Sequence, residues 1–177
     1  MEEAVANVLM SDNHEAVISQ AMELHGQALL ELVYSYVQNQ ELAKDLTQEI
    51  FIKCYQKLHQ YNGKAKFKTW LWQIAINHCK DYLKSWYNRN IFISEEHAGA
   101  AASTREAVEN EVVAKDEQEH LAQAVMNLYA PYREAIYLHY YEDLSIKEIS
   151  YVTGLNQNTV KTRLKRARVL LKESLEG

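Results

Sequence analysis

Apolar residues recur at helical spacing along most of the 177-residue chain. Successive apolar positions lie three or four residues apart, which predicts amphipathic helices rather than strands. Five glycines and one proline are too few for the frequent turns that a sheet protein needs. The predicted helices cover 13–37, 41–60, 67–87, 114–129, 131–141, 146–153 and 158–175.

The stretch 94–105 interrupts this pattern, because it is small, polar and without an apolar stripe. Acidic residues continue from it to Glu119, and such a composition is typical of a linker. An ordinary solvated connector is the alternative. The sequence therefore predicts an all-α fold of two small helical domains, at 1–92 and 118–177, joined by a flexible acidic linker at 93–117. The second domain is predicted to be a helix-turn-helix.

The net charge of the chain is −5, but the charged residues are unevenly distributed along it. Residues 60–90 hold six basic residues and one acidic residue, and residues 152–177 hold six basic and two acidic. The segment 91–120 between them carries eight acidic residues. Because a local basic face matters more to a nucleic acid than the overall charge, the two basic segments are candidate DNA-binding surfaces.

Several other classes of protein are disfavoured. No stretch approaches the roughly 18 apolar residues of a membrane span, and Glu2 and Glu3 stand where a secretory signal carries positive charge. We therefore expect a cytoplasmic protein without membrane insertion. Cys54 and Cys79 are expected to be reduced, and no histidine pair has metal-ligand spacing. We expect no metal, cofactor, small-molecule substrate or enzymatic activity, with a helical metalloenzyme as the distant alternative.

The segment 145–160 has the layout of a helix-turn-helix. Gly154 supplies the left-handed backbone of a tight turn, and Leu155 fills the corner. Asn156 or Asn158 can cap the next helix. The apolar face of the first helix consists of Ile146, Ile149 and Val152.

The last predicted helix separates an apolar stripe from a basic face. At 100° per residue the stripe spans about 40° on either side of Val160, and it consists of Val160, Leu164, Ala167 and Leu171. The opposite arc holds Lys161, Thr162, Lys165 and Arg166. Arg163 and Arg168 lie on the two shoulders. A helix that reads the major groove needs this arrangement, with base readers on its crest and phosphate contacts on its flanks. A solvated basic face is the alternative.

Two helices of the N-terminal domain also carry distinct polar stripes. In the helix 41–60, Leu42, Leu46, Ile50 and Cys54 follow core spacing. The opposite side carries an acidic and amide stripe that includes one apolar residue, which suggests a protein-binding face: Asp45, Gln48, Glu49, Ile52 and Gln56. A solvated surface is the alternative.

The third helix carries a polar, basic stripe of Gln73, Asn77, Lys80 and Lys84. A separate sector with Trp72 and Ile76 is more apolar than a free surface needs. Basic and amide groups beside aromatic residues suit a surface that holds unstacked bases. Aromatic residues on a helix are more often part of the core, and this is the alternative interpretation.

Three motifs together resemble those of a bacterial extracytoplasmic-function (group IV) sigma factor of the sigma-70 family. They are Asp-Leu-Thr-Gln-Glu-Ile-Phe at 45–51, Phe-Lys-Thr-Trp-Leu-Trp-Gln-Ile-Ala-Ile-Asn at 67–77, and Thr-Val-Lys-Thr-Arg-Leu-Lys-Arg-Ala-Arg at 159–168. They occur in family order and at family spacing. Lys165 stands where some members carry an aromatic residue.

The resemblance implies a promoter-specificity subunit of RNA polymerase that acts in a stress response. It assigns contacts with core polymerase to Asp45, Gln48, Glu49, Ile52 and Gln56. It assigns binding of the −10 element to Tyr61, Asn62, Lys64, Lys66, Gln73, Asn77, Lys80 and Lys84. It assigns binding of the −35 element to Thr159, Lys161, Thr162, Arg163, Lys165, Arg166 and Arg168.

The resemblance also implies that the linker threads polymerase channels and that an anti-sigma factor holds the protein inactive. A stand-alone helix-turn-helix transcriptional regulator, whose N-terminal domain senses or dimerises, is the competing hypothesis.

Overall fold

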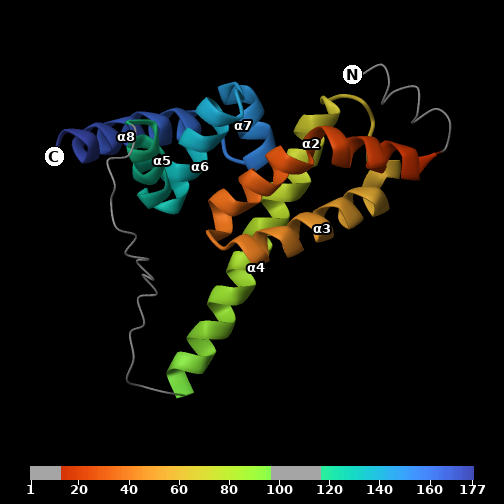
Figure 1. Cartoon of the computed structure of the whole chain (residues 1–177), viewed down its shortest axis with the longest axis horizontal. Coiled ribbons are helices and arrows are strands. Elements are labelled where there is room, and N and C mark those ends of the chain that lie inside the picture. The colour runs from red at the N-terminus through yellow and green to blue at the C-terminus, as the bar shows by residue number, and fades with distance from the viewer. Residues whose placement is uncertain (1–12, 97–116) are drawn as a thin grey trace.

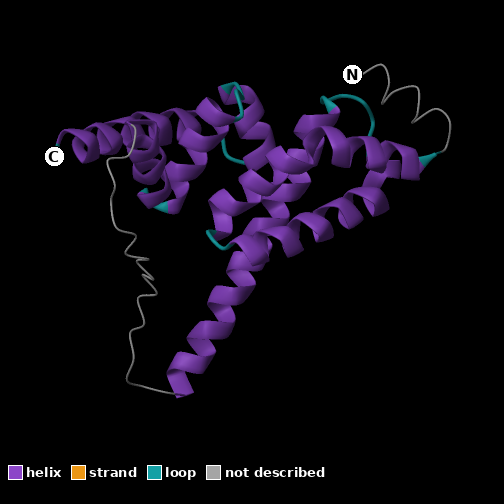
Figure 2. Ribbon diagram, in the orientation of Figure 1, coloured by secondary structure: helices purple, strands orange, loops and turns teal. Residues whose placement is uncertain are grey.

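The computed structural model describes residues 13–96 and 117–177, and every regular element in these ranges is helical. The predicted all-α class is confirmed. The elements, in chain order, are α2 (His14–Val37), α3 (Gln40–Lys57), a 3₁₀ turn (Leu58–Gln60), α4 (Phe67–Glu96), α5 (Glu117–Asn127), α6 (Ala130–Ile136), a π-helical turn (Tyr137–Tyr141), α7 (Ile146–Thr153) and α8 (Gln157–Glu176). Figure 1 shows their arrangement, and Figure 2 shows that the loops within each of the two described ranges are short.

Helices α2, α3 and α4 pack against one another and form the N-terminal unit. Asparagine side chains begin the first two helices, because Asn13 and Asn39 accept the amides of Ala16 and Leu42. Gln38 closes α2 in the left-handed conformation, at φ 52°. The apolar faces meet in a core that contains Leu29, Leu32, Leu46, Ile50, Cys54, Leu71 and Ile76.

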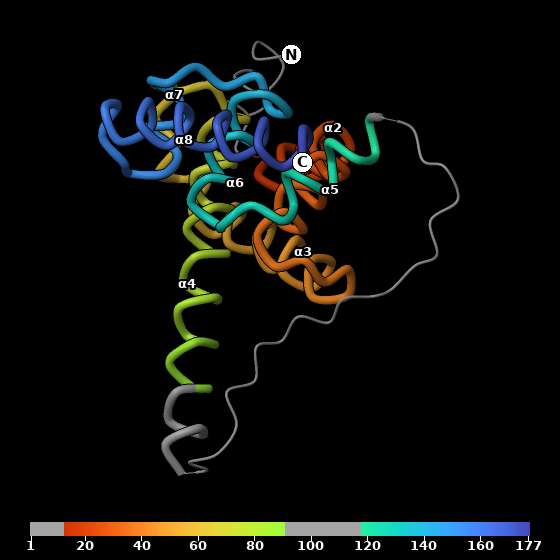
Figure 3. Tube along the Cα trace, turned by 90° about the vertical axis from the view of Figure 1, so that its left-hand side faces the viewer, coloured from red at the N-terminus to blue at the C-terminus, as the bar shows by residue number. Residues whose placement is uncertain are grey.

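Helix α4 is longer than predicted. It was expected to end by Tyr87 but continues to Glu96. The physical reason is that residues 88–96 contain neither glycine nor proline, so nothing in the backbone stops the helix. Its second half projects away from the other helices, as Figures 1 and 3 show. The rest of the predicted linker, 97–116, lies outside the described residues.

The C-terminal unit contains the predicted helix-turn-helix. Ser145 and Glu148 form a reciprocal capping box at the start of α7, and Gly154 ends the helix at φ 74°. Asn156, rather than Asn158, caps α8 by accepting the amide of Thr159. The predicted apolar stripe is confirmed, since Val160, Leu164 and Ala167 are buried and Leu171 is half-buried.

The two units pack against each other, with α4 against α7 and α2 against α6. The apolar sector of the third predicted helix is not a free surface, because Trp72 and Ile76 are fully buried and the Trp72 indole donates to Glu142 of the C-terminal unit. At the edge of the contact, the Gln38 amide donates to the Met126 carbonyl at 2.7 Å. The chain is therefore closed, with its two basic segments brought into one body.

Candidate nucleic-acid and polymerase interfaces

The outer face of α8 is open to solvent. Lys161, Thr162, Lys165 and Arg166 are all exposed. Across the described residues none of the three basic side chains among them has a hydrogen-bond or ion-pair partner. Val160 and Leu164 fix the opposite face in the core, so the rotation of the helix presents these four residues outward. The predicted crest of the reading helix thus exists as a free surface.

The two shoulders of α8 are occupied by contacts within the protein. Arg168 Nε donates to the Tyr140 hydroxyl at 2.7 Å, and its guanidinium lies 5.6 Å from the ring centroid. Arg163 Nη1 lies 4.0 Å from Glu134 Oε1. The half-buried Thr159 donates its amide to the cap of the helix. These predicted residues are held in position, whereas the crest is not.

The loop before α4 is ordered by its own side chains. The Tyr61 hydroxyl donates to the Ala65 carbonyl at 2.7 Å, and its ring packs on Phe67 and Trp70. Asn62 accepts the Lys64 amide around Gly63, whose φ is 72°. Among the predicted −10 residues of the loop, Asn62, Lys64 and Lys66 are exposed. Tyr61 is half-buried, and its ring contacts give it a packing role.

The predicted polar stripe of the third helix lies on α4, and we call it the α4 stripe: Gln73, Asn77, Lys80 and Lys84. Within the described part of the chain, two of these residues are free and two are bound by other groups. Asn77 and Lys84 are exposed. Gln73 donates to the Tyr151 carbonyl of α7 at 3.3 Å. Lys80 Nζ lies 2.9 Å from Glu134 Oε2 of α6. The C-terminal unit therefore covers part of the surface predicted to bind the −10 element.

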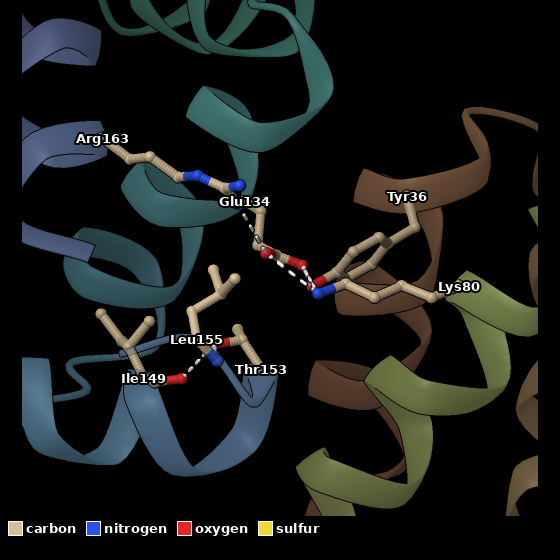
Figure 4. Close-up of polar contacts among 7 residues, drawn as sticks. All are labelled: Tyr36, Lys80, Glu134, Ile149, Thr153, Leu155 and Arg163. Atoms are coloured by element: carbon tan, nitrogen blue, oxygen red, sulfur yellow. Dashed lines mark hydrogen bonds and ion pairs between the residues drawn. The ribbon is translucent and has the colours of Figure 1, made fainter. Parts of the chain in front are cut away.

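Glu134 is the centre of this contact (Figure 4). Its side chain is 5 % exposed, and it accepts the Tyr36 hydroxyl at 2.5 Å in addition to the Lys80 ammonium. Arg163 approaches its other oxygen. Burial and the neighbouring carboxylate hold the pKa of Tyr36 well above its usual value, so its proton stays on the phenol. Two donors, from α2 and α4, thus bind one carboxylate of α6, and a guanidinium of α8 lies nearby.

A second carboxylate, that of Glu142 after the π-helical turn, also binds residues of α4. The Trp72 indole donates to Glu142 Oε2 at 2.9 Å, and Lys68 Nζ lies 3.4 Å from the same oxygen. Burial raises the pKa of Glu142, while Lys68 and the indole hydrogen bond oppose that rise. The Lys68 ammonium also stands 4.9 Å from the Trp72 ring centroid. Both carboxylates therefore bind basic residues of α4.

A polar cavity of 480 Å³ lies beside the stripe and includes residues that were not predicted. Lys53, Lys57 and Gln60 of α3 and the following turn face Gln73 and Asn77 across it. The available signal was the pair of lysines four residues apart, which places both on one face of α3. The cavity joins cations of α3 to amides of α4, and this set of groups suits a nucleotide.

The predicted protein-binding stripe of α3 is exposed along its length. Asp45, Gln48, Glu49, Ile52 and Gln56 are all exposed, and Ile52 is 59 % exposed. Tyr55, which was not predicted, adds a further exposed apolar side chain at the edge of this stripe. His78 of α4 joins the stripe to the cavity, because its Nε2 lies 2.8 Å from Glu49 and its Nδ1 3.1 Å from Lys53. We call the five predicted residues the α3 stripe.

Other kinds of site find no support in the described part of the chain. No cluster of possible metal ligands occurs there, and none of its helices is long and apolar enough to cross a bilayer. Cys54 and Cys79 are free thiols, and burial raises the pKa of each to about 12. Such thiols are protonated and unreactive at neutral pH.

Two family models match the chain in the order of its two units. The model described as sigma-70 region 2 matches residues 21–88, and the model described as sigma-70 region 4 matches residues 118–171. The first match contains the α3 stripe and the α4 stripe, and the second contains the helix-turn-helix. We therefore call the two units region 2 and region 4.

Characterised relatives match over most of their length. RNA polymerase sigma factor SigV of Bacillus subtilis is 30 % identical over 156 residues, which cover 85 % of this chain and 86 % of the relative. The ECF RNA polymerase sigma factor SigM of the same species is 30 % identical, with 88 % and 93 % covered. The ECF RNA polymerase sigma-E factor of Escherichia coli K12 is 31 % identical, with 77 % and 75 % covered.

Solved structures share the fold. The sigma factor RpoE of Bartonella quintana, in complex with the anti-sigma factor NepR, has a TM-score of 0.69 at 24 % identity, with 89 % of this chain and 96 % of that one covered. CnrH, in complex with the cytosolic domain of CnrY, has a TM-score of 0.68 at 23 % identity, with 99 % and 97 % covered. The chain belongs to the sigma-70 family of RNA polymerase sigma factors. Within this family it belongs to the extracytoplasmic-function group, and it acts in promoter recognition at transcription initiation.

Proposed function

We propose that region 4 reads the −35 element with the crest of α8. The observation that carries this assignment is that Lys161, Thr162, Lys165 and Arg166 are exposed on the face opposite the buried stripe. Lysine and arginine match guanine acceptors in the major groove. Arg163, Arg168 and Thr159 flank the crest and are assigned to the phosphate backbone.

The −10 element is assigned to region 2. Asn62, Lys64 and Lys66 of the loop would meet the separated strand, and the α4 stripe with the adjoining cavity would hold an unstacked base. Tyr61 acts in this assignment by shaping the loop. Lys53 and Lys57 join the set because they line the same cavity as Asn77.

The α3 stripe is assigned to core polymerase. Its exposed Ile52 and Tyr55 lie among amide and acidic groups, a composition typical of a protein interface with an apolar centre and a polar rim. We divide the chain for these roles at 1–92, 93–117 and 118–177. The protein would have no catalytic activity of its own, since RNA synthesis belongs to core polymerase, and it would work in the cytoplasm.

An anti-sigma factor is the further partner that we assign. RpoE of Bartonella quintana was solved with the anti-sigma factor NepR, and this chain shares its fold. Family membership decides against the stand-alone regulator, because such a regulator has no need of region 2.

The substitution Gln48→Ala with Glu49→Ala tests the core assignment. Both side chains are exposed, so region 2 should stay folded. We expect transcription by reconstituted holoenzyme and pull-down of core polymerase to be lost, while binding of the full chain to a −35 duplex is unchanged. Glu15→Ala on the exposed start of α2 is the matched control and should retain both activities. Retained core binding in the double variant would refute the assignment, and loss of −35 binding as well would indicate misfolding.

A further inference from the structure

Glu134 unites basic residues from both of the surfaces assigned to DNA. Lys80 belongs to the α4 stripe and Arg163 to the shoulder of the reading helix, yet both side chains converge on this one carboxylate. A carboxylate offers these cations two acceptor oxygens, as a DNA phosphate does. The geometry in Figure 4 is therefore that of an internal anion at the place where the two surfaces meet.

Burial makes this contact conditional. A buried carboxylate loses its hydration, and the loss is offset only while its donors stay in place. Tyr36, Lys80 and Arg163 come from three different helices, and the first two belong to region 2. When the regions separate, Tyr36 and Lys80 leave the carboxylate together, while Arg163 of α8 stays beside Glu134 within region 4. The contact is then all-or-none, which is the behaviour of a latch.

The same closure covers neighbouring groups of the α4 stripe. Gln73 donates to the Tyr151 carbonyl of α7. Elsewhere on α4, Glu142 of region 4 binds Lys68 and Trp72. By contrast, the crest of α8 remains exposed. Closure therefore restricts the surface assigned to the −10 element and leaves the base readers assigned to the −35 element available.

We propose that Glu134 is an autoinhibitory latch that stands in for DNA phosphate, holds the free chain closed, and lowers its affinity for single-stranded DNA until the regions separate. This proposal rests on the assignment of the α4 stripe to the −10 strand. The apparent affinity of a protein falls in proportion to the fraction of open molecules. Breaking the latch should therefore tighten DNA binding without adding a contact.

Three variants of the full chain test the latch. Glu134→Gln keeps the shape of the side chain but turns an amide toward Lys80. Gln38→Gly removes the hydrogen bond from region 2 to the Met126 carbonyl, at a left-handed position where glycine is favoured, and it leaves the groups around Glu134 unchanged. Glu173→Gln, on the exposed end of α8, makes the same change of charge as the first variant and serves as its control.

Two readouts separate the latch from the DNA assignment. Small-angle X-ray scattering measures the radius of gyration, and it reports opening without any ligand. Fluorescence anisotropy measures affinity for a labelled single-stranded DNA of about 12 nucleotides and mixed sequence, a length within the usual site size. Circular dichroism confirms that each variant keeps its helical content.

We expect Glu134→Gln to increase the radius of gyration and to tighten DNA binding about tenfold, which corresponds to roughly 1.4 kcal/mol. Gln38→Gly should do the same by about fivefold, the effect of one neutral hydrogen bond. Glu173→Gln should change neither readout beyond the small effect of net charge. This pattern supports the latch.

Other patterns overturn it. A wild-type chain that already scatters as an extended particle contradicts the closed state. Tighter DNA binding by Glu134→Gln alone, with no expansion and no effect of Gln38→Gly, shows that only the local charge mattered. Expansion of both variants with unchanged DNA affinity instead refutes the −10 assignment of α4, and with it the inhibitory role, while leaving the closure itself established.

Discussion

The two basic surfaces of this sigma factor are alike in charge but opposite in exposure. On α8 the crest residues face solvent, whereas on α4 two of the four stripe residues bind groups of region 4. The difference follows from what lies behind each helix. The buried face of α8 packs within its own region, but α4 packs both on α2 and α3 of region 2 and on α7 of region 4. Helix α8 therefore packs within one region, whereas α4 packs against both regions.

This contrast teaches that the exposure of a basic helix face depends on the width of the apolar sector on the same helix. A narrow stripe on α8 leaves most of the circumference polar, while the wider sector on α4 draws a second unit across it. DNA binding by the crest of α8 should then be independent of the contact between the regions, whereas DNA binding by the α4 stripe should depend on it. The predictions below test this difference, beginning with the largest expected effect.

Arg166→Ala should cause the largest loss on the open surface. Its side chain is exposed and has no partner among the described residues, so the loss should be confined to DNA. We expect specific −35 binding to weaken by about 1–3 kcal/mol if the guanidinium contacts a base edge. Titration of cognate and base-substituted duplexes measures the effect. An equal loss for every sequence would contradict a base-reading role.

Arg168→Ala should have a smaller and uniform effect. The Tyr140 hydroxyl holds this guanidinium on the shoulder, away from the crest, so we expect weaker binding to all duplexes and a salt slope lower by about 0.9 for one phosphate contact. Tyr140→Phe is the matched variant, since it keeps the ring but removes the hydrogen bond. It should lose part of the same affinity. Sequence-dependent losses in Arg168→Ala would place the residue among the base readers.

Much of the exposed surface, on the crest of α8 and on the α3 stripe, could be predicted from the local sequence pattern. The period of Val160, Leu164 and Ala167 fixes the rotation of α8, and a glycine with flanking cap residues marks its beginning. The same reasoning placed the α3 stripe on an exposed face. These features depend on neighbours within a few turns, and such neighbours are visible along a sequence.

The surface of α4 that region 4 covers could be predicted only in part. The extra apolar sector of α4 was visible, but its polar partner Glu142 lies 70 residues away from Trp72. Glu134 resembles an ordinary surface acid in sequence, and it is buried only because Tyr36 and Lys80 meet it from region 2. Periodicity carries no information about such long-range partners. The end of α4 was also missed, because no glycine or proline marks a helix end between Tyr87 and Glu96.

Paired glycine substitutions should sharpen the comparison through stability. Gly154→Ala places a Cβ in open space at φ 74°, so only backbone strain of about 1–2 kcal/mol is expected in region 4. Gly26→Ala, inside α2 and also in open space, should stabilise region 2 by about 0.5–1 kcal/mol. Calorimetry reads both. If the closed chain unfolds as one unit, each variant should show a single unfolding transition, at a lower temperature in Gly154→Ala and at a higher temperature in Gly26→Ala. Two separate transitions, of which each variant shifts only one, would indicate independent regions.

The smallest expected effect concerns the thiol of Cys54, which should not respond to opening at all. Burial within region 2 raises its pKa to about 12, and α3 packs on α2 and α4. Because a raised thiol pKa keeps the group protonated at every lower pH, the folded chain should react negligibly with a thiol reagent at pH near 8. In a Cys79→Ala background, Glu134→Gln should leave this rate unchanged, since separating the regions exposes α6 and α4 but not the inner face of α3. Faster labelling in that variant would mean that region 2 itself loosens when region 4 departs. The covered surface would then be part of the fold of region 2 rather than a face that region 4 merely closes.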